Sequence, residues 1–196
     1  MSEGAGPYQV MPEPRITKGD IALRAVEPND IEAIRQWRNA QMHVLRQSAP
    51  ITPEDQIRYF STYVWPEKFK AEPAQILLAI EYSDELVGYG GLVHISWPNH
   101  RAEVSFLLAP ELERDDNLRS MVFGKFLRLL QIFAFGKLGL HRLYTETFKH
   151  RGVHLSTLES VGFRLEGCMR AHELIDGLPT DSLLHGCLAK DWERME

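Results

Sequence analysis

Glu103 and His94 are the two residues of the sequence whose types and spacing could perform proton transfer. They stand on either side of residues 97–100, WPNH, a composition typical of a tight turn between two strands. A two-residue or a symmetric four-residue loop places His94 opposite Glu103, with Cβ atoms about 4.5–5.5 Å apart. Such a pair could pass a substrate proton through water, with His94 orienting Glu103. A structural cross-strand pair fits the same pattern, and a bulge would place the two on opposite faces.

The elements that must position this pair follow from the apolar pattern. The expected strands cover 21–26, 75–82, 86–96, 101–109, 140–148, 163–175 and 180–189. Helices are expected after the capping residues Asn29 and Thr52 and over 119–138 and 153–161. The last two strands should form a hairpin around Asp176 and Gly177. The sequence therefore predicts an α/β (α+β) fold with a mixed central sheet of about seven strands and about four helices.

Composition indicates one globular domain. The chain has 196 residues, of which 44% are hydrophobic and 25% charged, enough to bury a core. We expect residues 1–19 to be a flexible tail and 20–196 to form the domain. The net charge of −5 argues against a general nucleic-acid binder, and no apolar run suggests a membrane span. Two separated cysteines, Cys168 and Cys187, indicate no metal site and a reduced, cytoplasmic protein.

Four segments, in the same order along the chain, resemble the GNAT superfamily of N-acetyltransferases, in particular its RimJ/RimL-type branch. Residues 101–111, RAEVSFLLAPE, resemble the family's fourth strand, and residues 134–143 resemble the join between its third helix and fifth strand. Residues 158–167 resemble the end of its fourth helix, and 175–181 its final hairpin. The resemblance covers 20–192 and implies the GNAT fold, acyl-CoA-dependent N-acetyltransferase activity and acetyl-CoA as co-substrate.

The resemblance also implies roles for the strand at 101–109. The family positions the thioester with backbone groups of this strand, where it splays from the next strand. Here those groups belong to Phe106, Leu107 and Leu108. A backbone N–H aimed at the thioester carbonyl stabilises the oxyanion of the tetrahedral intermediate. Glu103, in the same strand, is the expected base for the substrate ammonium, and Tyr144 in the following strand is expected in the core.

The expected pyrophosphate site departs from the family pattern. The family opens its third helix with Arg/Gln-x-x-Gly-x-Gly/Ala, whereas an ungapped alignment puts Met121 and Phe123 at the glycine positions. A shift by one residue retains Gly124 alone, and Asp115 and Asp116 would repel phosphate. Basic residues that could bind the phosphates instead are Arg114, Arg119, Lys125 and Arg151. We therefore expect coenzyme A binding to be weakened and to depend on salt.

The expected acceptor is a primary amine of a small molecule, an amino sugar or an amino-acid derivative. Residues 36–39, QWRN, resemble the first helix of PseH-type amino-sugar acetyltransferases, and also occur in protein N-terminal acetyltransferases. Trp37 and Arg38 are therefore candidate substrate-binding residues, although Trp37 also suits the core and Arg38 the surface. Protein N-terminal acetylation, or a degenerate GNAT domain acting as a non-catalytic binding module, are the alternatives. A homodimer is an open option, whereas nucleic-acid and membrane partners are not expected.

Overall fold

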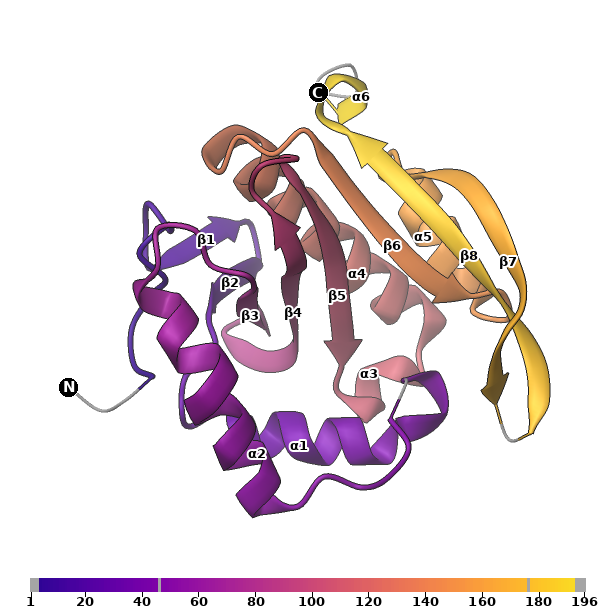
Figure 1. Ribbon diagram of the computed structural model, residues 1–196, viewed down its shortest axis with the longest axis horizontal. Coiled ribbons are helices and arrows are strands. Elements are labelled where there is room, and N and C mark those ends of the chain that lie inside the picture. The colour runs from indigo at the N-terminus through magenta and orange to yellow at the C-terminus, as the bar shows by residue number, and fades with distance from the viewer. Residues whose placement is uncertain (1–3, 46, 176, 193–196) are drawn as a thin grey trace.

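The computed structural model describes residues 4–45, 47–175 and 177–192, which form one mixed sheet flanked by helices (Figure 1). The strands are β1 (Arg15–Lys18), β2 (Ile21–Ala25), β3 (Ile76–Tyr82), β4 (Glu85–Ser96), β5 (Arg101–Leu108), β6 (Arg142–Phe148), β7 (Arg164–Ile175) and β8 (Leu178–Leu188). The helices are α1 (Ile31–Ala40), α2 (Pro53–Tyr59), α3 (Pro110–Glu113), α4 (Asp116–Gln131), α5 (Gly152–Ser160) and α6 (Ala189–Trp192). Shorter helical turns cover Met42–Val44, Phe60–Val64, Trp65–Phe69 and Ile132–Lys137.

The eight strands lie in the order β1-β2-β3-β4-β5-β6-β8-β7. β5 and β6 run parallel, and every other neighbouring pair is antiparallel. The expected mixed α/β fold is confirmed, with one strand more than the sequence predicted. That strand is β1, which pairs with β2. The expected C-terminal hairpin forms from β7 and β8, although Asp176 in its turn lies outside the described residues.

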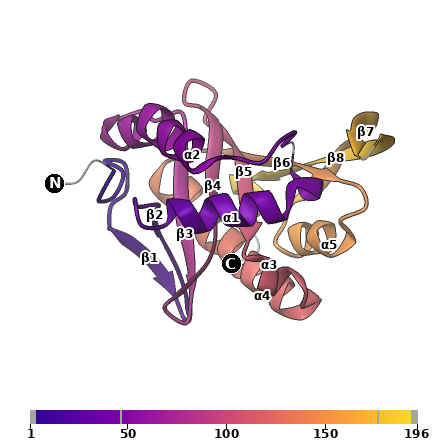
Figure 2. The same ribbon diagram turned by 90° about the horizontal axis from the view of Figure 1, so that it is seen from below.

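Two hydrophobic clusters lie on opposite faces of the sheet, because successive side chains of a strand point to opposite sides. In β3, Ile76, Leu78 and Ile80 pack into the cluster that includes α4 and α5. The alternate residues Leu77 and Ala79 pack into the cluster that includes α1 and the helical turn Phe60–Val64, on the face that α1 and α2 cover (Figures 1 and 2). In the part of the chain that the structure describes, no helix combines the length and apolar character needed to cross a bilayer.

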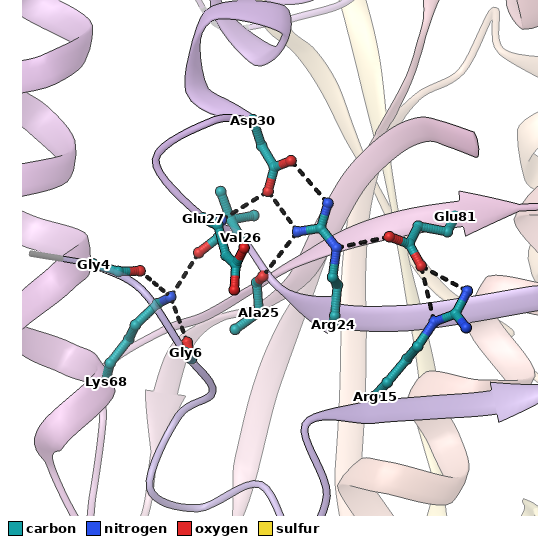
Figure 3. A network of polar contacts seen from close by, with 10 residues as sticks. All are labelled: Gly4, Gly6, Arg15, Arg24, Ala25, Val26, Glu27, Asp30, Lys68 and Glu81. Carbon is teal, nitrogen blue, oxygen red and sulfur yellow. Dashed lines mark hydrogen bonds and ion pairs between the residues drawn. The ribbon is translucent and has the colours of Figure 1, made fainter. Parts of the chain in front are cut away.

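The amino-terminal segment differs from the flexible tail that the sequence predicted, since residues 4–18 pack against the domain. Tyr8 is buried, and its hydroxyl accepts a hydrogen bond of 2.9 Å from the backbone N–H of Leu77. The buried ammonium group of Lys68 donates to the carbonyl oxygens of Gly4, Gly6 and Val26 over 2.6–2.8 Å (Figure 3). Burial lowers the pKa of Lys68 to about 8. These interactions depend on contacts distant in sequence, which composition alone could not indicate.

The start of α1 also differs from its prediction. Asp30, not Asn29, precedes the helix, and its carboxylate caps no helical N–H group. It accepts instead from the backbone of Glu27 and binds the Arg24 guanidinium twice, at 2.6 and 2.9 Å. Arg24 Nε donates to Glu81 at 2.7 Å (Figure 3). This network ties α1 to β2 and β3. The predicted cap at Thr52 is confirmed, because its hydroxyl accepts from the Asp55 N–H.

Candidate active site

The sheet opens between β5 and β6. These strands pair only where Arg101–Glu103 faces Arg142–Tyr144, and beyond that point they separate, as Figure 1 shows. A central cavity of about 550 Å³ lies at the opening, lined by residues of both strands, by Phe123 of α4 and by Arg151 and His154 near α5. The splay that the family resemblance implied is therefore present, and residues 103–106 of β5 line the cavity.

The direction of the β5 backbone decides which of its groups face this cavity. The Ala109 N–H donates to the Val87 carbonyl in the direction of β4. Because backbone groups alternate along a strand, those of Leu107 also face β4, whereas those of Phe106 and Leu108 face the opening. Leu107 is thus wrongly placed for the predicted thioester contact. The Leu108 carbonyl accepts a 2.8 Å hydrogen bond from the Gln41 side chain, and Leu108 itself is buried.

Glu103 and His94 lie in contact at the wall of the central cavity. Glu103 Oε2 lies 2.8 Å from His94 Nδ1, so the predicted contact is confirmed. The predicted register holds between Ser96 and Arg101, but it is wrong at Glu103, which pairs with Val93 instead of His94. The two residues between Val93 and Ser96 form a bulge, in which His94 adopts a φ of 48°. This turn of the backbone brings the imidazole back to Glu103 despite the shifted register.

Tyr144 lies beside Glu103, in contrast to its predicted place in the core. The two residues pair across β5 and β6. The Tyr144 ring lies 5.8 Å from the guanidinium of Arg101 and 6.0 Å from that of Arg142. Desolvation, together with the nearby Glu103 carboxylate, raises the pKa of Tyr144, so its phenol keeps its proton. Sequence reasoning missed this neighbour because the register of parallel strands leaves no local signal.

A second cavity, here called the α1–α2 cavity, has about 400 Å³ and adjoins the central one. Arg38, Val93 and Ser105 line both. Arg38 donates to the Tyr89 hydroxyl at 2.8 Å and to the Gln47 side chain at 3.2 Å. Arg38 therefore lies at the junction of the two cavities, and its role in substrate binding stays a prediction. Trp37 lines neither cavity and packs against the apolar cluster beneath α1, which is its alternative role.

A third cavity, here called the α5 cavity, has about 610 Å³ and adjoins the central one on the other side. Its wall contains the arginines Arg114, Arg119 and Arg151 and the histidines His43, His150 and His154. Arg119 binds Glu113 and Asp116, at 3.1 and 2.6 Å, so carboxylates already neutralise it. The nearby His154 is buried and stacks on Phe123; desolvation lowers its pKa well below the ordinary value, so it is neutral near pH 7. Arg114 and Arg151 remain as the cations best placed for an anionic ligand.

The carboxylate of Asp115 lies at the first turn of α4. The Asp115 carboxylate accepts from the backbone N–H groups of Asn117 and Leu118, at 2.9 and 3.0 Å. These are the donors that a phosphate group would use at a helix amino terminus. The helix also begins earlier than predicted, because Asp115 caps it. The Asp115 carboxylate therefore lies where a phosphate group would bind, in line with the repulsion of phosphate that the sequence predicted.

Two predicted cofactor-binding residues lie away from the cavities. Lys125 binds the carboxylate of Asp20 at 2.6 and 2.8 Å and lies over the Tyr82 ring, on the side of α4 that faces β1 and β2. Gly124 faces α5, where an added Cβ would lie 3.6 Å from Thr157. Gly124 was predicted from an alignment with the glycine loop, and Lys125 from its positive charge near that loop. The helix turns these positions away from the sheet opening.

A group of potential metal ligands includes Glu146 of β6, which also lines the central cavity. Glu146, His172 and Glu173 each bring one ligand atom within 4.8 Å of the others. His172 lies 3.8 Å from Glu146 and 4.0 Å from Glu173, which is the arrangement of a surface ion-pair cluster. We assign no metal ion to this group of residues.

Comparisons with known proteins agree with this geometry. Residues 23–184 match the family model described as an acetyltransferase (GNAT) domain. An uncharacterized N-acetyltransferase p20 of Bacillus licheniformis is 21% identical over 173 residues, covering 88% of this chain and 94% of the relative.

Solved structures of similar fold include a spermidine N-acetyltransferase from Vibrio cholerae in complex with CoA and spermine. It superimposes with a TM-score of 0.76 at 18% identity, over 90% of this chain and 99% of that one. A probable acetyltransferase gives a TM-score of 0.70 at 21% identity, over 91% and 98% of the two chains. At these identities the structures support the fold, and the family model, which spans most of the chain, supports the membership. The chain belongs to the GNAT acetyltransferase family.

Proposed function

We propose that the protein transfers the acetyl group of acetyl-CoA to a primary amine of a small molecule by direct attack. The observation that carries the proposal is the row of three adjoining cavities along the opening between β5 and β6, with Glu103 at the central one. The central cavity shares Arg38 with the α1–α2 cavity and Arg151 with the α5 cavity. The row suits an amine at one end, the thioester in the middle and the coenzyme phosphates at the other end.

In this proposal the acceptor ammonium loses a proton toward Glu103 through water. The neutral nitrogen then forms a bond to the thioester carbonyl carbon. The carbonyl oxygen becomes an oxyanion, which the N–H of Phe106 or Leu108 stabilises. The carbon–sulfur bond breaks, the thiolate leaves with coenzyme A, and a second nitrogen-bound proton passes to solvent. His94 orients Glu103 through their 2.8 Å contact.

The phosphate end supports a weaker version of the usual coenzyme contact. Arg114 and Arg151 can supply charge-assisted hydrogen bonds where the family uses glycine-loop amides. Asp115 occupies two of the backbone donors of α4. We therefore propose that coenzyme A binding is electrostatic and falls steeply with salt.

The occupied donors at Asp115 also favour one alternative, a GNAT domain that serves as a non-catalytic binding module. Isothermal titration with acetyl-CoA at low ionic strength separates the two. The enzyme proposal predicts salt-dependent binding, followed by release of coenzyme A when a suitable amine is added. Absence of acetyl-CoA binding at low salt, in a folded protein, would establish the module instead.

A further inference from the structure

Arg38 holds a cationic group at the junction of the central and α1–α2 cavities. Its side chain donates hydrogen bonds to neutral acceptors, the Tyr89 hydroxyl and the Gln47 side-chain oxygen. Across residues 4–45, 47–175 and 177–192, no carboxylate forms an ion pair with it. A half-buried guanidinium has five donors, so several of them remain for an acceptor brought by a ligand.

The carboxylates at the walls of the central and α1–α2 cavities already have partners. Glu146 of β6 lines the central cavity and lies 3.8 Å from His172. Asp55, the acidic residue that lines the α1–α2 cavity, forms an ion pair with Arg58 on the same helix. Glu103 contacts His94 and faces the central cavity. The remaining wall of the α1–α2 cavity is largely apolar or aromatic. Its main contributors are Ile34, Ile51, Tyr59, Phe60, Leu77 and Tyr89.

We infer that the acceptor is an amine that also carries an anionic group, a carboxylate or a phosphate, bound by Arg38, and an apolar or ring-shaped body held in the α1–α2 cavity. This inference rests on the proposed function and adds the charge of the substrate to it. The amine lies toward Glu103 and the anion toward Arg38, so the two charges of the ligand meet opposite charges of the protein. The apolar body is removed from water by the residues beneath α1 and α2.

The same arrangement disfavours a polyamine. The Vibrio cholerae enzyme of similar fold is named for spermidine, which carries several ammonium groups. In this chain a second ammonium reaching into the α1–α2 cavity would meet the Arg38 cation with no uncommitted carboxylate beside it. Like charges at close range in a desolvated site are unfavourable and discriminate against such a ligand.

Matched probes test the inference with the full chain. L-leucine is compared with L-leucinamide, and D-glucosamine 6-phosphate with D-glucosamine, because each pair differs chiefly in its anionic group. Spermidine is the fifth probe. Coenzyme A release gives kcat and KM for each, and isothermal titration in the presence of coenzyme A gives the affinity. At least one anionic probe should show a KM or Kd lower than its neutral partner by about tenfold or more, the value of one charge-assisted hydrogen bond.

Variants connect that preference to Arg38. Arg38→Ala should weaken binding of the preferred anionic probe by about tenfold or more and change its neutral partner less than about threefold. The acetyl-CoA affinity should stay unchanged. Arg38→Lys keeps the charge and should recover part of the preference; it also carries the test if Arg38→Ala does not fold. Arg128→Ala removes an exposed arginine of α4 on the far face of the sheet and serves as the control.

The outcomes separate the inference from the proposed function. A preference for leucine shows that the anion is a carboxylate, and one for glucosamine 6-phosphate that it is a phosphate. Spermidine or neutral probes binding as well as the anionic ones would overturn the inference while acetylation still supports the enzyme. Equal losses for both members of a pair in Arg38→Ala, or no binding of any probe, would overturn it too. Acetyl-CoA binding then decides the proposed function on its own.

Discussion

An arginine lies near each end of α1, Arg24 of β2 near its start and Arg38 near its end, and among the residues that the structure describes only Arg24 has carboxylate partners. At the start of the helix, Arg24 binds Asp30 twice and Glu81 once. Near its end, the Arg38 guanidinium donates to the Tyr89 hydroxyl and to the Gln47 side chain, and it lines both the central and the α1–α2 cavity. Both side chains are partly buried and both lie against the sheet. The difference shows that an arginine with satisfied charge stabilises the fold, whereas one whose charge lacks a partner in the protein is available to a ligand.

The α5 cavity repeats the contrast. Arg119 has two carboxylate partners, while Arg114 and Arg151 face the cavity and form no ion pair with any residue that the structure describes. Desolvation lowers the pKa of Arg151, although a guanidinium stays charged near pH 7. Partly buried positive charge without a counter-ion is unfavourable, and a phosphate group would relieve it. The contrast predicts that substitutions that break an ion pair lower the stability of the fold, whereas substitutions of unpaired cations lower the affinity for a ligand.

The largest expected effect is on stability. Asp30→Ala leaves Arg24 without its bidentate partner and the Glu27 N–H without its acceptor, so the free energy of unfolding should fall by about 3 kcal/mol. Urea denaturation followed by circular dichroism measures it. Glu72→Ala, which removes an exposed carboxylate, should change it by less than about 0.5 kcal/mol. Equal losses in both variants would remove the distinction between paired and unpaired charges.

Glu103→Gln should affect turnover and spare the fold. The amide keeps the size of the side chain but cannot accept the ammonium proton, so kcat should fall by about 10²-fold or more. Acetyl-CoA affinity, from isothermal titration, should remain as in the wild type. Glu85→Gln, an exposed change at the start of β4, is the control. Wild-type turnover in Glu103→Gln would exclude the carboxylate as the base and leave its contact with His94 a structural one.

A double change of the unpaired cations tests the phosphate end. Arg114→Ala combined with Arg151→Ala should weaken acetyl-CoA binding by about tenfold at low salt, because each cation can supply a charge-assisted hydrogen bond. The difference from the wild type should shrink as salt is added. Arg119→Ala should act differently, lowering stability more than affinity, since Glu113 loses its partner. Affinity that is unchanged in the double variant would place the coenzyme phosphates elsewhere.

Whether a sequence prediction was confirmed depends on how far apart in the sequence the interacting residues lie. The strands, most helices and the Thr52 cap depend on local patterns, and the structure confirms them. The contact between His94 and Glu103 could also be predicted from the sequence, since a hairpin brings nearby residues together. The shift in register between β4 and β5 could not be predicted, because a bulge depends on how β4 fits the rest of the sheet.

The failed predictions all depend on orientation or on contacts distant in sequence. Leu107 and Lys125 are on the expected elements, but the strand and the helix turn them away from the opening. Tyr144 reaches Glu103 only through the parallel register of β5 and β6. The packed amino-terminal segment depends on Lys68, more than sixty residues away. A sequence motif therefore located the site, while the sheet topology decided which of its residues face the cavity.

The smallest expected effect concerns Asp115, a carboxylate that supplies the protein's own anion at the start of α4. Asp115→Ser keeps a side-chain oxygen that can cap the helix but removes the negative charge near Arg114 and Arg151. Stability should change by less than about 1 kcal/mol, because serine and aspartate are comparable caps. Acetyl-CoA should bind a few-fold tighter at low salt, since a nearby charge at a helix terminus contributes about 0.3–1 kcal/mol.

The direction of that change distinguishes two accounts of the altered glycine loop. If Asp115 only caps the helix, its replacement leaves the affinity for acetyl-CoA unchanged at every salt concentration. If the carboxylate competes with the coenzyme phosphates for the N–H groups of Asn117 and Leu118, the affinity rises and the gain declines with added salt. Asp116→Ser, one residue further along, is the matched control: its carboxylate binds Arg119 rather than the helix terminus. A gain in Asp115→Ser that Asp116→Ser does not reproduce would show that the chain keeps a phosphate site at α4, held at reduced affinity by its own carboxylate.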